Sequence, residues 1–263
     1  MKLAVSGKGG VGKTTVSAML AGLYGKRGKP VLVVDADPSP NLALALGVPK
    51  QARDKITPLS QMLDLIEERT GVRPGSSYGK MFKLNPEVED LVDKFGLRVT
   101  DKVRLLVLGS VEAGGSGCFC PENALLRRLV KHVVLDRDEV LIMDMEAGVE
   151  HLGRGTAEGV DLMLVVVEPG LRSVETAARI KSLASDVGIS KVVAVVNKVR
   201  VDADLDAVRN ELEQIGIPII GSIPQDPAMV SADLKGSSPT DLVSAATMDA
   251  VRHLMERIDG YAP

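Results

Sequence analysis

Nine consecutive residues near the amino terminus have the types and spacing needed to hold a polyphosphate. Residues 7–15 read GKGGVGKTT and fit the pattern G-x-x-x-x-G-K-[ST]. In this pattern, glycines let successive backbone N–H groups turn inward around phosphate oxygens, and the following helix adds the positive end of its dipole. We expect Lys13 to reach the β- and γ-phosphates and the Thr14 hydroxyl to bind Mg²⁺. The other nucleotide-binding residues expected in this P-loop are Gly9, Gly10, Val11, Gly12 and Thr15.

A second lysine, Lys8, lies inside the same loop. Since Lys13 already serves the phosphates, Lys8 is not needed to cradle them. One interpretation is a charge that only contacts solvent. The other is a finger that crosses to the nucleotide of a facing subunit and neutralises the charge developing on the transferred phosphoryl group, as an arginine finger does. In that case Lys8 is catalytic, and hydrolysis requires a dimer.

Two carboxylates, Asp35 and Asp37, stand at the end of the apolar run 30–36. A carboxylate at the end of a buried strand is costly unless it meets a metal ion or hydrogen-bond donors. We expect Asp37 to orient the attacking water, and Asp35 to lie in the outer shell of Mg²⁺ or to brace the P-loop lysine. The alternative is that the pair caps a helix beginning near Asn41.

A third carboxylate, Asp144, ends the apolar run 140–143 and fits a Walker B strand. The aspartate of such a strand positions Mg²⁺ through water or through the P-loop hydroxyl, here Thr14. An apolar run ending in Asp is a weak signal alone, but it becomes a strong one behind a P-loop. Residues 145–148 would then sense the γ-phosphate and move when it leaves.

Asn197 and Lys198 follow the apolar run 193–196, at a position where a nucleotide base commonly lies. Proteins that read guanine place Asp two residues after this lysine, and the residue at that position here is Arg200. We therefore predict a preference for ATP, with Asn197 bonding to the adenine edge. The segment 224–227, which begins with Pro224, would form a wall of the base site; the alternative is a simple turn.

The two cysteines, Cys118 and Cys120, form a C-x-C pair between a glycine-rich segment and Pro121. Proline suits the first position of a helix, and a helix amino terminus favours the thiolate form that binds metal ions. A closed tetrahedral site needs four ligands. Two chains related by a twofold axis would supply four thiolates to a soft or borderline metal ion. Incidental loop thiols and a redox pair are the alternatives.

Composition narrows the class of protein. The 263 residues contain no linker-like segment, so we predict a single domain over residues 1–263. The net charge of −3 and the six aromatic residues (three Tyr, three Phe) argue against general nucleic-acid binding. No apolar stretch approaches the roughly 18 residues of a membrane span, and residues 1–2 lead directly into a strand. We expect a cytoplasmic protein without nucleic-acid or membrane partners, and surface positions for His132, His151 and His253.

Apolar runs alternate with helical patterns along most of the chain, which predicts an α/β fold. We expect a doubly wound, mostly parallel sheet with helices on both faces, and ligands at the carboxyl ends of the strands. Residues 57–96 carry two helical patterns and would be either an insert that contacts a partner or a helical cover for the sheet. Predicted strands are 2–6, 30–36, 103–108, 139–143, 161–167, 191–196 and 217–223, and predicted helices are 15–28, 121–135, 173–187, 204–215 and 241–258.

Taken together, these motifs resemble those of the MinD/ParA-like deviant-Walker ATPases over the full length of the chain. The sequence is most similar to the CooC family, whose members assist nickel insertion into carbon monoxide dehydrogenase. Besides the P-loop, the match is carried by 35–38 (DADP), 118–120 (CFC) and 144–152 (DMEAGVEHL). The last two motifs narrow the choice to the nickel branch.

The resemblance implies an ATP-hydrolysing homodimer that binds Ni²⁺, or Zn²⁺, between its subunits. Its nucleotide state would be coupled to metal release toward the Ni-Fe-S cluster of carbon monoxide dehydrogenase. A related accessory role in the maturation of acetyl-CoA synthase would use the same residues, so that client remains an alternative.

Two other classes of ATPase share the P-loop. Positioning ATPases of the ParA/MinD type cycle on DNA or membrane, and their membrane-bound members end in a basic amphipathic helix. The carboxyl terminus here, residues 255–263, is mixed in charge. Electron-transfer ATPases such as the nitrogenase iron protein hold a cluster with a cysteine after the Walker B strand, where this chain has Glu146. We therefore favour metal delivery.

Overall fold

The computed structural model describes residues 1–75, 81–109, 121–137, 139–148 and 159–262. Eight strands form one sheet in the order β3-β4-β2-β5-β1-β6-β7-β8. All pairings are parallel except β3 with β4. The strands are β1 Lys2–Ser6, β2 Val31–Asp35, β3 Leu97–Arg98, β4 Val103–Val107, β5 Val140–Asp144, β6 Leu162–Val167, β7 Val192–Val199 and β8 Ile219–Pro224.

The central strands are apolar throughout because both faces of the sheet are covered. All five residues of β2 are buried, and neighbouring residues such as Val33 and Val34 belong to core clusters on opposite faces. A strand buried on two sides needs no polar alternation. This is why its sequence reads as a continuous run of Val and Leu rather than as an alternating pattern.

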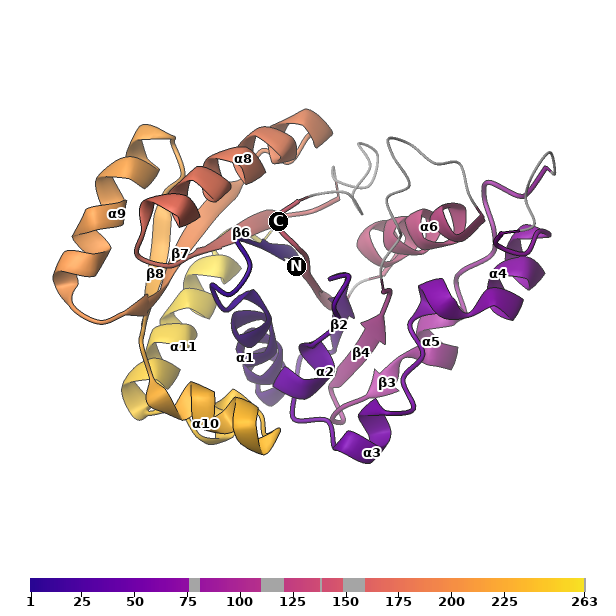
Figure 1. Ribbon diagram of the computed structural model, residues 1–263, viewed down its shortest axis with the longest axis horizontal. Helices are drawn as coiled ribbons and strands as arrows, with labels where there is room; N and C mark the ends of the chain where they lie inside the picture. The colour runs from indigo at the N-terminus through magenta and orange to yellow at the C-terminus, as the bar shows by residue number, and fades with distance from the viewer. Residues whose placement is uncertain (76–80, 110–120, 138, 149–158, 263) are drawn as a thin grey trace.

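Helices form a layer on each side of the sheet. In Figure 1, α6, α8 and α9 lie above the sheet and α1 and α11 lie below it. Core residues agree, since Val130, Ile180 and Val208 join one cluster, and Leu20 and Val251 join the other. The predicted doubly wound, mostly parallel sheet is confirmed. These helices are α1 Lys13–Lys26, α6 Pro121–Leu135, α8 Leu171–Val187, α9 Asp202–Gln214 and α11 Ala245–Asp259.

The described part of segment 57–96 is helical and packs on the outside of α6. Its elements are the 3₁₀ turn η1 Leu59–Gln61, α4 Leu63–Thr70 and α5 Leu91–Phe95. Ile66 and Leu91 are buried in the cluster that contains the apolar face of α6, and α4 contacts α6 directly. These contacts are those expected of a helical cover. A contact between this segment and a partner stays a prediction, as does the assignment of the whole chain to one domain.

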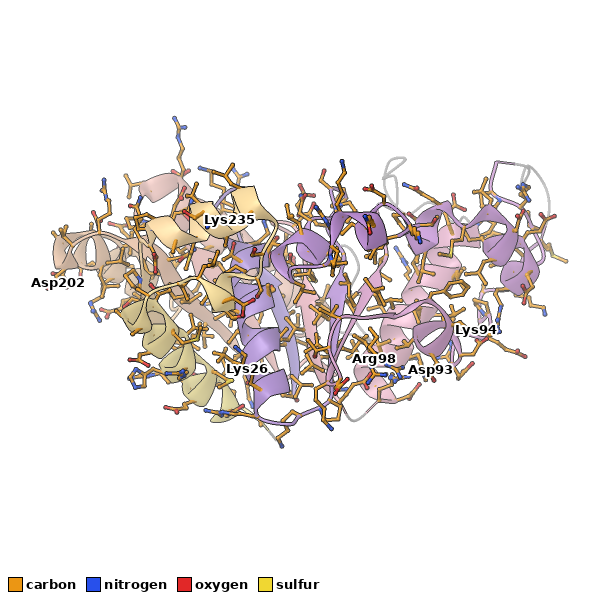
Figure 2. All side chains as sticks on the ribbon, turned by 90° about the horizontal axis from the view of Figure 1, so that it is seen from below. Lys26, Asp93, Lys94, Arg98, Asp202 and Lys235 are labelled. Atoms are coloured by element: carbon orange, nitrogen blue, oxygen red, sulfur yellow. The ribbon has the colours of Figure 1, made fainter. Side chains whose placement is uncertain are left out.

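Several short elements are absent from the sequence prediction. The antiparallel strand β3 has two residues, too few for a readable alternation. The others are α2 Leu42–Ala45, α3 Lys50–Arg53, α10 Pro227–Lys235 and η2 Pro239–Asp241. Figure 2 shows the face formed by α1, α10 and α11, with Lys26 at the end of α1 and Lys235 at the end of α10.

The surface position expected for His132 is wrong. Its side chain on α6 is buried, and its Nδ1 lies 3.1 Å from Asp136 Oδ2. The reason is that His132 lies in a cavity beside the starts of β1, β2 and β5, which Met1, Pro30 and Glu139 also line. His253 is exposed on α11, as expected, and His151 lies outside the described residues.

If the cover is an integral part of the fold, Leu91→Ala will lower the free energy of unfolding by about 2–5 kcal/mol. Leu91 is fully buried, so the substitution leaves a cavity beneath the cover. Urea unfolding followed by circular dichroism measures the change. The matched control is Leu84→Ala, since Leu84 is 58% exposed. Equal stabilities of the two variants would contradict tight packing of the cover.

Candidate functional site

The P-loop connects the end of β1 to the start of α1 and is held closely by neighbouring strands. A Cβ atom on Gly7 would collide with the backbone carbonyl oxygen of Val166 in β6. Gly12 has a φ of 97°, and a Cβ atom there would collide with the side-chain amide of Asn197. Both glycines are therefore required by close approach as well as by backbone conformation.

The first turn of α1 presents free backbone donors at the loop. Gly12 precedes the helix and provides no side-chain cap, so the first N–H groups lack the usual capping acceptor. A helix amino terminus of this kind attracts anions through its N–H groups and its dipole. The geometry therefore fits a bound phosphate group.

The Lys13 side chain is largely buried beside this helix start, with 7% exposure. Its ammonium lies 3.5 Å from the Lys8 carbonyl oxygen, a long hydrogen bond for a group with three donors. Within the described ranges, no carboxylate lies within ion-pair distance of Lys13. The Lys13 ammonium is therefore a buried cation with too few hydrogen-bond acceptors, and the oxygens of a bound polyphosphate would supply the missing ones.

Asp144 at the end of β5 is the buried carboxylate nearest to the P-loop side chains. Its Oδ1 accepts a hydrogen bond from the Ser17 hydroxyl at 3.2 Å. Its Oδ2 is buried and receives no well-aligned hydrogen bond from the described part of the chain. Burial raises the pKa of Asp144 to about 6, while the Thr14 hydroxyl and the Lys13 ammonium act in the opposite direction. An orphaned carboxylate oxygen beside a hydroxyl fits the oxygen ligands that Mg²⁺ prefers, directly or through water.

Asp35 lies directly opposite Asp144 on the neighbouring strand β2. Its Oδ2 accepts the N–H of Leu42 at 2.9 Å, and its Oδ1 accepts the N–H of Asp37 at 3.3 Å. Burial raises the pKa of Asp35 to about 7, and the Asp144 charge adds to this shift. Asp35 thus holds the start of α2, as the alternative of a helix-capping role predicts. Its carboxylate makes no hydrogen bond with Lys13, the P-loop lysine that it was expected to brace.

Asp37 and Lys8 stand nearer to solvent at the same edge. Asp37 is half-buried, its Oδ1 accepts the N–H of Ser39 at 2.8 Å, and its charge raises the pKa of Asp144. Lys8 is half-exposed, and its ammonium has no ion pair with the residues that the structure describes. Asp37 is therefore close to the predicted magnesium site, and Lys8 is free to reach outward.

Asn197 and Lys198 contact the P-loop itself. Asn197 Nδ2 donates to the Val11 carbonyl at 2.8 Å, while its buried Oδ1 lacks a partner among the described residues. Lys198 Nζ donates to the Gly10 carbonyl at 2.6 Å and lies 3.1 Å from Glu168 Oε2. The predicted contact of Asn197 with an adenine edge is compatible with the free Oδ1 and stays a prediction.

The turn after β8 has a structural task. Pro224 ends β8 and is half-buried. Asp226 accepts the N–H groups of Ala228 and Ser244 and the Thr247 hydroxyl, and thereby fixes the starts of α10 and α11. These contacts are those expected if segment 224–227 is a simple turn. The role of Pro224 as a wall of the base site stays a prediction.

Comparison with known proteins decides the family. Residues 2–240 match the CobQ/CobB/MinD/ParA nucleotide-binding domain. The chain belongs to this family. An uncharacterized ATP-binding protein of Methanocaldococcus jannaschii is 48% identical over 262 residues, covering 99% of this chain and 97% of that protein. The carbon monoxide dehydrogenase accessory protein CooC of Rhodospirillum rubrum is 44% identical over 255 residues, covering 97% and 95%.

Solved structures of MinD/ParA proteins share the fold. The MinD cell division protein of Aquifex aeolicus superposes with a TM-score of 0.69 at 22% identity, over 100% of this chain and 99% of that one. A ParA family ATPase from Chlorobium tepidum gives 0.67 at 20% identity, over 97% of each chain. The resemblance inferred from the motifs, a CooC-type member of the MinD/ParA-like proteins, is confirmed.

In this MinD/ParA family member, the segment after β5 is tied to the end of β1. The Ser6 hydroxyl donates to the Glu146 carbonyl at 2.5 Å, and the Met145 N–H donates to the Val5 carbonyl at 2.9 Å. Residues 145–148 thus leave the sheet beside the P-loop, where the predicted γ-phosphate sensor should begin. The remainder of that motif, 149–152, lies outside the described residues.

Two side chains that contact the predicted site residues, Ser17 and Glu168, were not identified from the sequence. Ser17 lies one turn beyond Thr14 on α1, so its spacing on the buried face of the helix was an available signal. Glu168 follows directly after β6 and shows no local motif. Its role becomes visible only when the sheet brings β6 beside the P-loop.

The predicted metal ligands Cys118 and Cys120 lie outside the described residues. Across the described ranges, no group of three or more His, Cys, Asp or Glu side chains is arranged to hold a metal ion. Likewise, none of the helices in the described ranges has the length and apolar character that crossing a membrane requires.

The buried carboxylates predict a pH dependence for the protein without nucleotide or Mg²⁺. The pKa values of Asp35 and Asp144, raised to about 7 and about 6, exceed the value near 4 of an unfolded aspartate. Between these limits the folded state binds more protons than the unfolded state, so the free energy of unfolding falls as the pH rises from about 4 to about 7.

Urea unfolding at a series of pH values between about 4 and about 8 measures this fall. The contribution of Asp35 is on the order of 4 kcal/mol over the whole range. Asp35→Asn, which cannot ionise, should remove that part of the slope while keeping an acceptor for the Leu42 N–H. A variant whose pH profile parallels the wild type would contradict the buried charge as its cause.

Proposed function

We propose that this chain is an ATP-hydrolysing homodimer that assists nickel insertion into the Ni-Fe-S cluster of a carbon monoxide dehydrogenase. The observation that carries the proposal is the 44% identity with the CooC protein of Rhodospirillum rubrum over nearly the whole of both chains. The geometry of the P-loop and its carboxylates supports the hydrolytic part. On this proposal the protein works in the cytoplasm without nucleic-acid or membrane partners.

The P-loop and the start of α1 bind the ATP phosphates. Lys13 neutralises the β- and γ-phosphates, and Gly9, Gly10, Val11, Gly12 and Thr15 line the cradle. Thr14, backed by Asp144, holds Mg²⁺. When bound, Mg²⁺ would supply positive charge that offsets the charge of the phosphates. Asp37, half-buried beside this site, orients the attacking water, and Asp35 keeps the strand end in place behind it.

The adenine base lies near the ends of β7 and β8. The Asn197 Oδ1 atom, buried and without a partner among the described residues, accepts a hydrogen from the adenine amino group. Pro224 forms one wall of this site. Arg200 pairs with Asp204 through a bond of 3.0 Å, so the residue that replaces a guanine-reading carboxylate is directed away to α9.

The metal ion carried to the client, Ni²⁺ or Zn²⁺, binds to Cys118 and Cys120 of both subunits. ATP draws the subunits together, because Lys8 of each chain completes the phosphate site of the other. Metal and nucleotide then stabilise the same dimer, so each raises the affinity for the other by the same factor. Hydrolysis loosens the dimer and releases the ion toward the client enzyme.

The hydrolytic role of Lys8 is tested by Lys8→Ala. We expect nucleotide affinity to change little, because Lys13 remains, and ATP turnover to fall by roughly a thousandfold, the loss typical of a missing finger residue. Phosphate release and isothermal titration with ADP measure the two quantities. The control is Lys26→Ala, at the far end of α1, about 20 Å along the helix from the loop.

Mixed dimers separate action across the interface from action within one subunit. Lys8→Ala and Asp37→Ala chains are each expected to be inactive alone. When mixed, one of the two sites combines an intact Asp37 with an intact Lys8 from the facing chain, so activity should return in part. A mixture as inactive as its components would refute the crossing finger.

Metal binding is tested by Cys118→Ala. We expect the wild type to bind one Ni²⁺ or Zn²⁺ per dimer and to dimerise when the ion is added, because four thiolates complete a tetrahedral site. The variant should lose both properties in metal analysis and analytical ultracentrifugation. Asp37→Ala serves as the control that retains metal-linked dimerisation. Unchanged metal stoichiometry in Cys118→Ala would overturn the thiolate assignment.

A further inference from the structure

Two consecutive residues at the end of β7 hold carbonyl groups of the P-loop. Asn197 donates to the Val11 carbonyl and Lys198 donates to the Gly10 carbonyl, at 2.8 and 2.6 Å. In the sheet, β6 lies between β7 and β1, the strand that leads into the loop. The two bonds therefore reach across a strand to fix a loop that is distant in sequence.

The backbone of Lys198 is strained, which indicates that its contact with the P-loop is important. Its φ is 60°, and it is the one non-glycine residue with a positive φ among those described. A left-handed conformation costs a lysine roughly 1–2 kcal/mol. The regular pairing of β7 with β8 also breaks between Val196 and Val199. A strained backbone conformation of this kind persists only where the surrounding structure holds it, and such conformations are common at functional sites.

The two bonds orient the peptide units that should face the phosphates. In a trans peptide, the carbonyl of one residue and the N–H of the next point in opposite directions. Holding the Gly10 and Val11 carbonyls therefore directs the N–H groups of Val11 and Gly12 toward the other side of the loop, where the Val11 N–H makes a long bond of 3.4 Å to the Lys8 carbonyl. Glycine-rich backbone has many alternative conformations, so this orientation needs an external restraint.

Glu168 sets the direction of the Lys198 side chain. Its Oε2 lies 3.1 Å from Lys198 Nζ, and its own backbone N–H donates to the buried Ser173 hydroxyl at 3.1 Å. The side chains of Lys198 and Glu168 are 43% and 30% exposed, and ion pairs so open to solvent add little stability. The pair is therefore better suited to aiming the ammonium than to stabilising the fold.

We propose that Lys198, aimed by Glu168, is a positioning residue that keeps the P-loop in its phosphate-binding conformation, with Asn197 as the second point of attachment. This rests on the proposed nucleotide binding and deepens it. Lys198 acts on the polyphosphate part of the ligand through the loop and not on the base. Loss of the lysine weakens binding of any ligand that presents linked phosphates, with or without a nucleoside.

Lys198→Gly separates positioning from stability. Glycine adopts a φ of 60° without penalty, so the melting temperature should change little. Affinity for Mg·ADP and for inorganic tripolyphosphate, measured by isothermal titration, should each fall by roughly tenfold, the loss expected for one charged hydrogen bond. The binding entropy should also become less favourable, because the loop is then ordered by the ligand. Glu168→Gln should give a smaller loss of the same kind.

A control variant and a replacement variant complete this test. Lys181 also donates to two backbone carbonyls, those of Ile215 and Gly216, but at the end of α9. Lys181→Met should lower the melting temperature and leave both affinities unchanged. Lys198→Asn, which tolerates the left-handed backbone but is too short to reach Gly10, replaces Lys198→Gly should that variant fold poorly.

The outcomes distinguish the possibilities. A variant that loses ADP affinity but keeps tripolyphosphate affinity would place Lys198 at the base and overturn the proposal. Wild-type affinity for both ligands, or a lowered melting temperature with unchanged affinities, would overturn it as well. A wild-type protein that binds neither ligand would instead refute the proposed function, and that result is visible before any variant is made.

Discussion

The buried carboxylate of Asp144 is the constraint around which the site is organised. It ends the central strand β5, lies opposite Asp35 on the neighbouring strand β2, and contacts α1 through the Ser17 hydroxyl. A charge in this position is costly, and the surrounding groups compensate it only in part: burial still raises its pKa to about 6, and one oxygen has no partner among the described residues. The core therefore contains a carboxylate whose hydrogen bonding is incomplete among the described residues, and a magnesium nucleotide is the ligand that would complete it.

The sheet brings this incomplete site together from segments distant in sequence. The parallel register places Val5 of β1, Asp35 of β2 and Asp144 of β5 at one level, so the P-loop and both carboxylates emerge at the same edge. The helices that pack on the two faces of the sheet then hold these strands in place. The contacts of Asp226 with α10 and α11 do the same at the end of β8. This turn therefore has a structural purpose, which is to fix the starts of two helices.

The sequence was sufficient for features encoded within one segment. The P-loop spacing, the apolar strands and the position of Asp144 after such a strand are local patterns, and the fold agrees with them. What the sequence could not supply depends on packing between segments. The two-residue β3, the burial of His132 beside the starts of the strands and the pairing of Glu168 with Lys198 leave no periodic trace. Asp35 is the intermediate case, since its burial was expected but its hydrogen bonds to the start of α2 follow from where that helix lies.

The close approach of Gly7 to β6 and of Gly12 to β7 has a mechanical consequence. Both ends of the loop are wedged against neighbouring strands, whereas side-chain space beside Gly9 and Gly10 is open for at least 4 Å. A rearrangement that follows the departure of a phosphate is therefore confined to the tip between these two ends, with no sliding of the whole segment. Turning the tip would also require the hydrogen bond from Lys198 to the Gly10 carbonyl to break, so a change in the loop would be felt at the end of β7 while the sheet beneath it stays at rest.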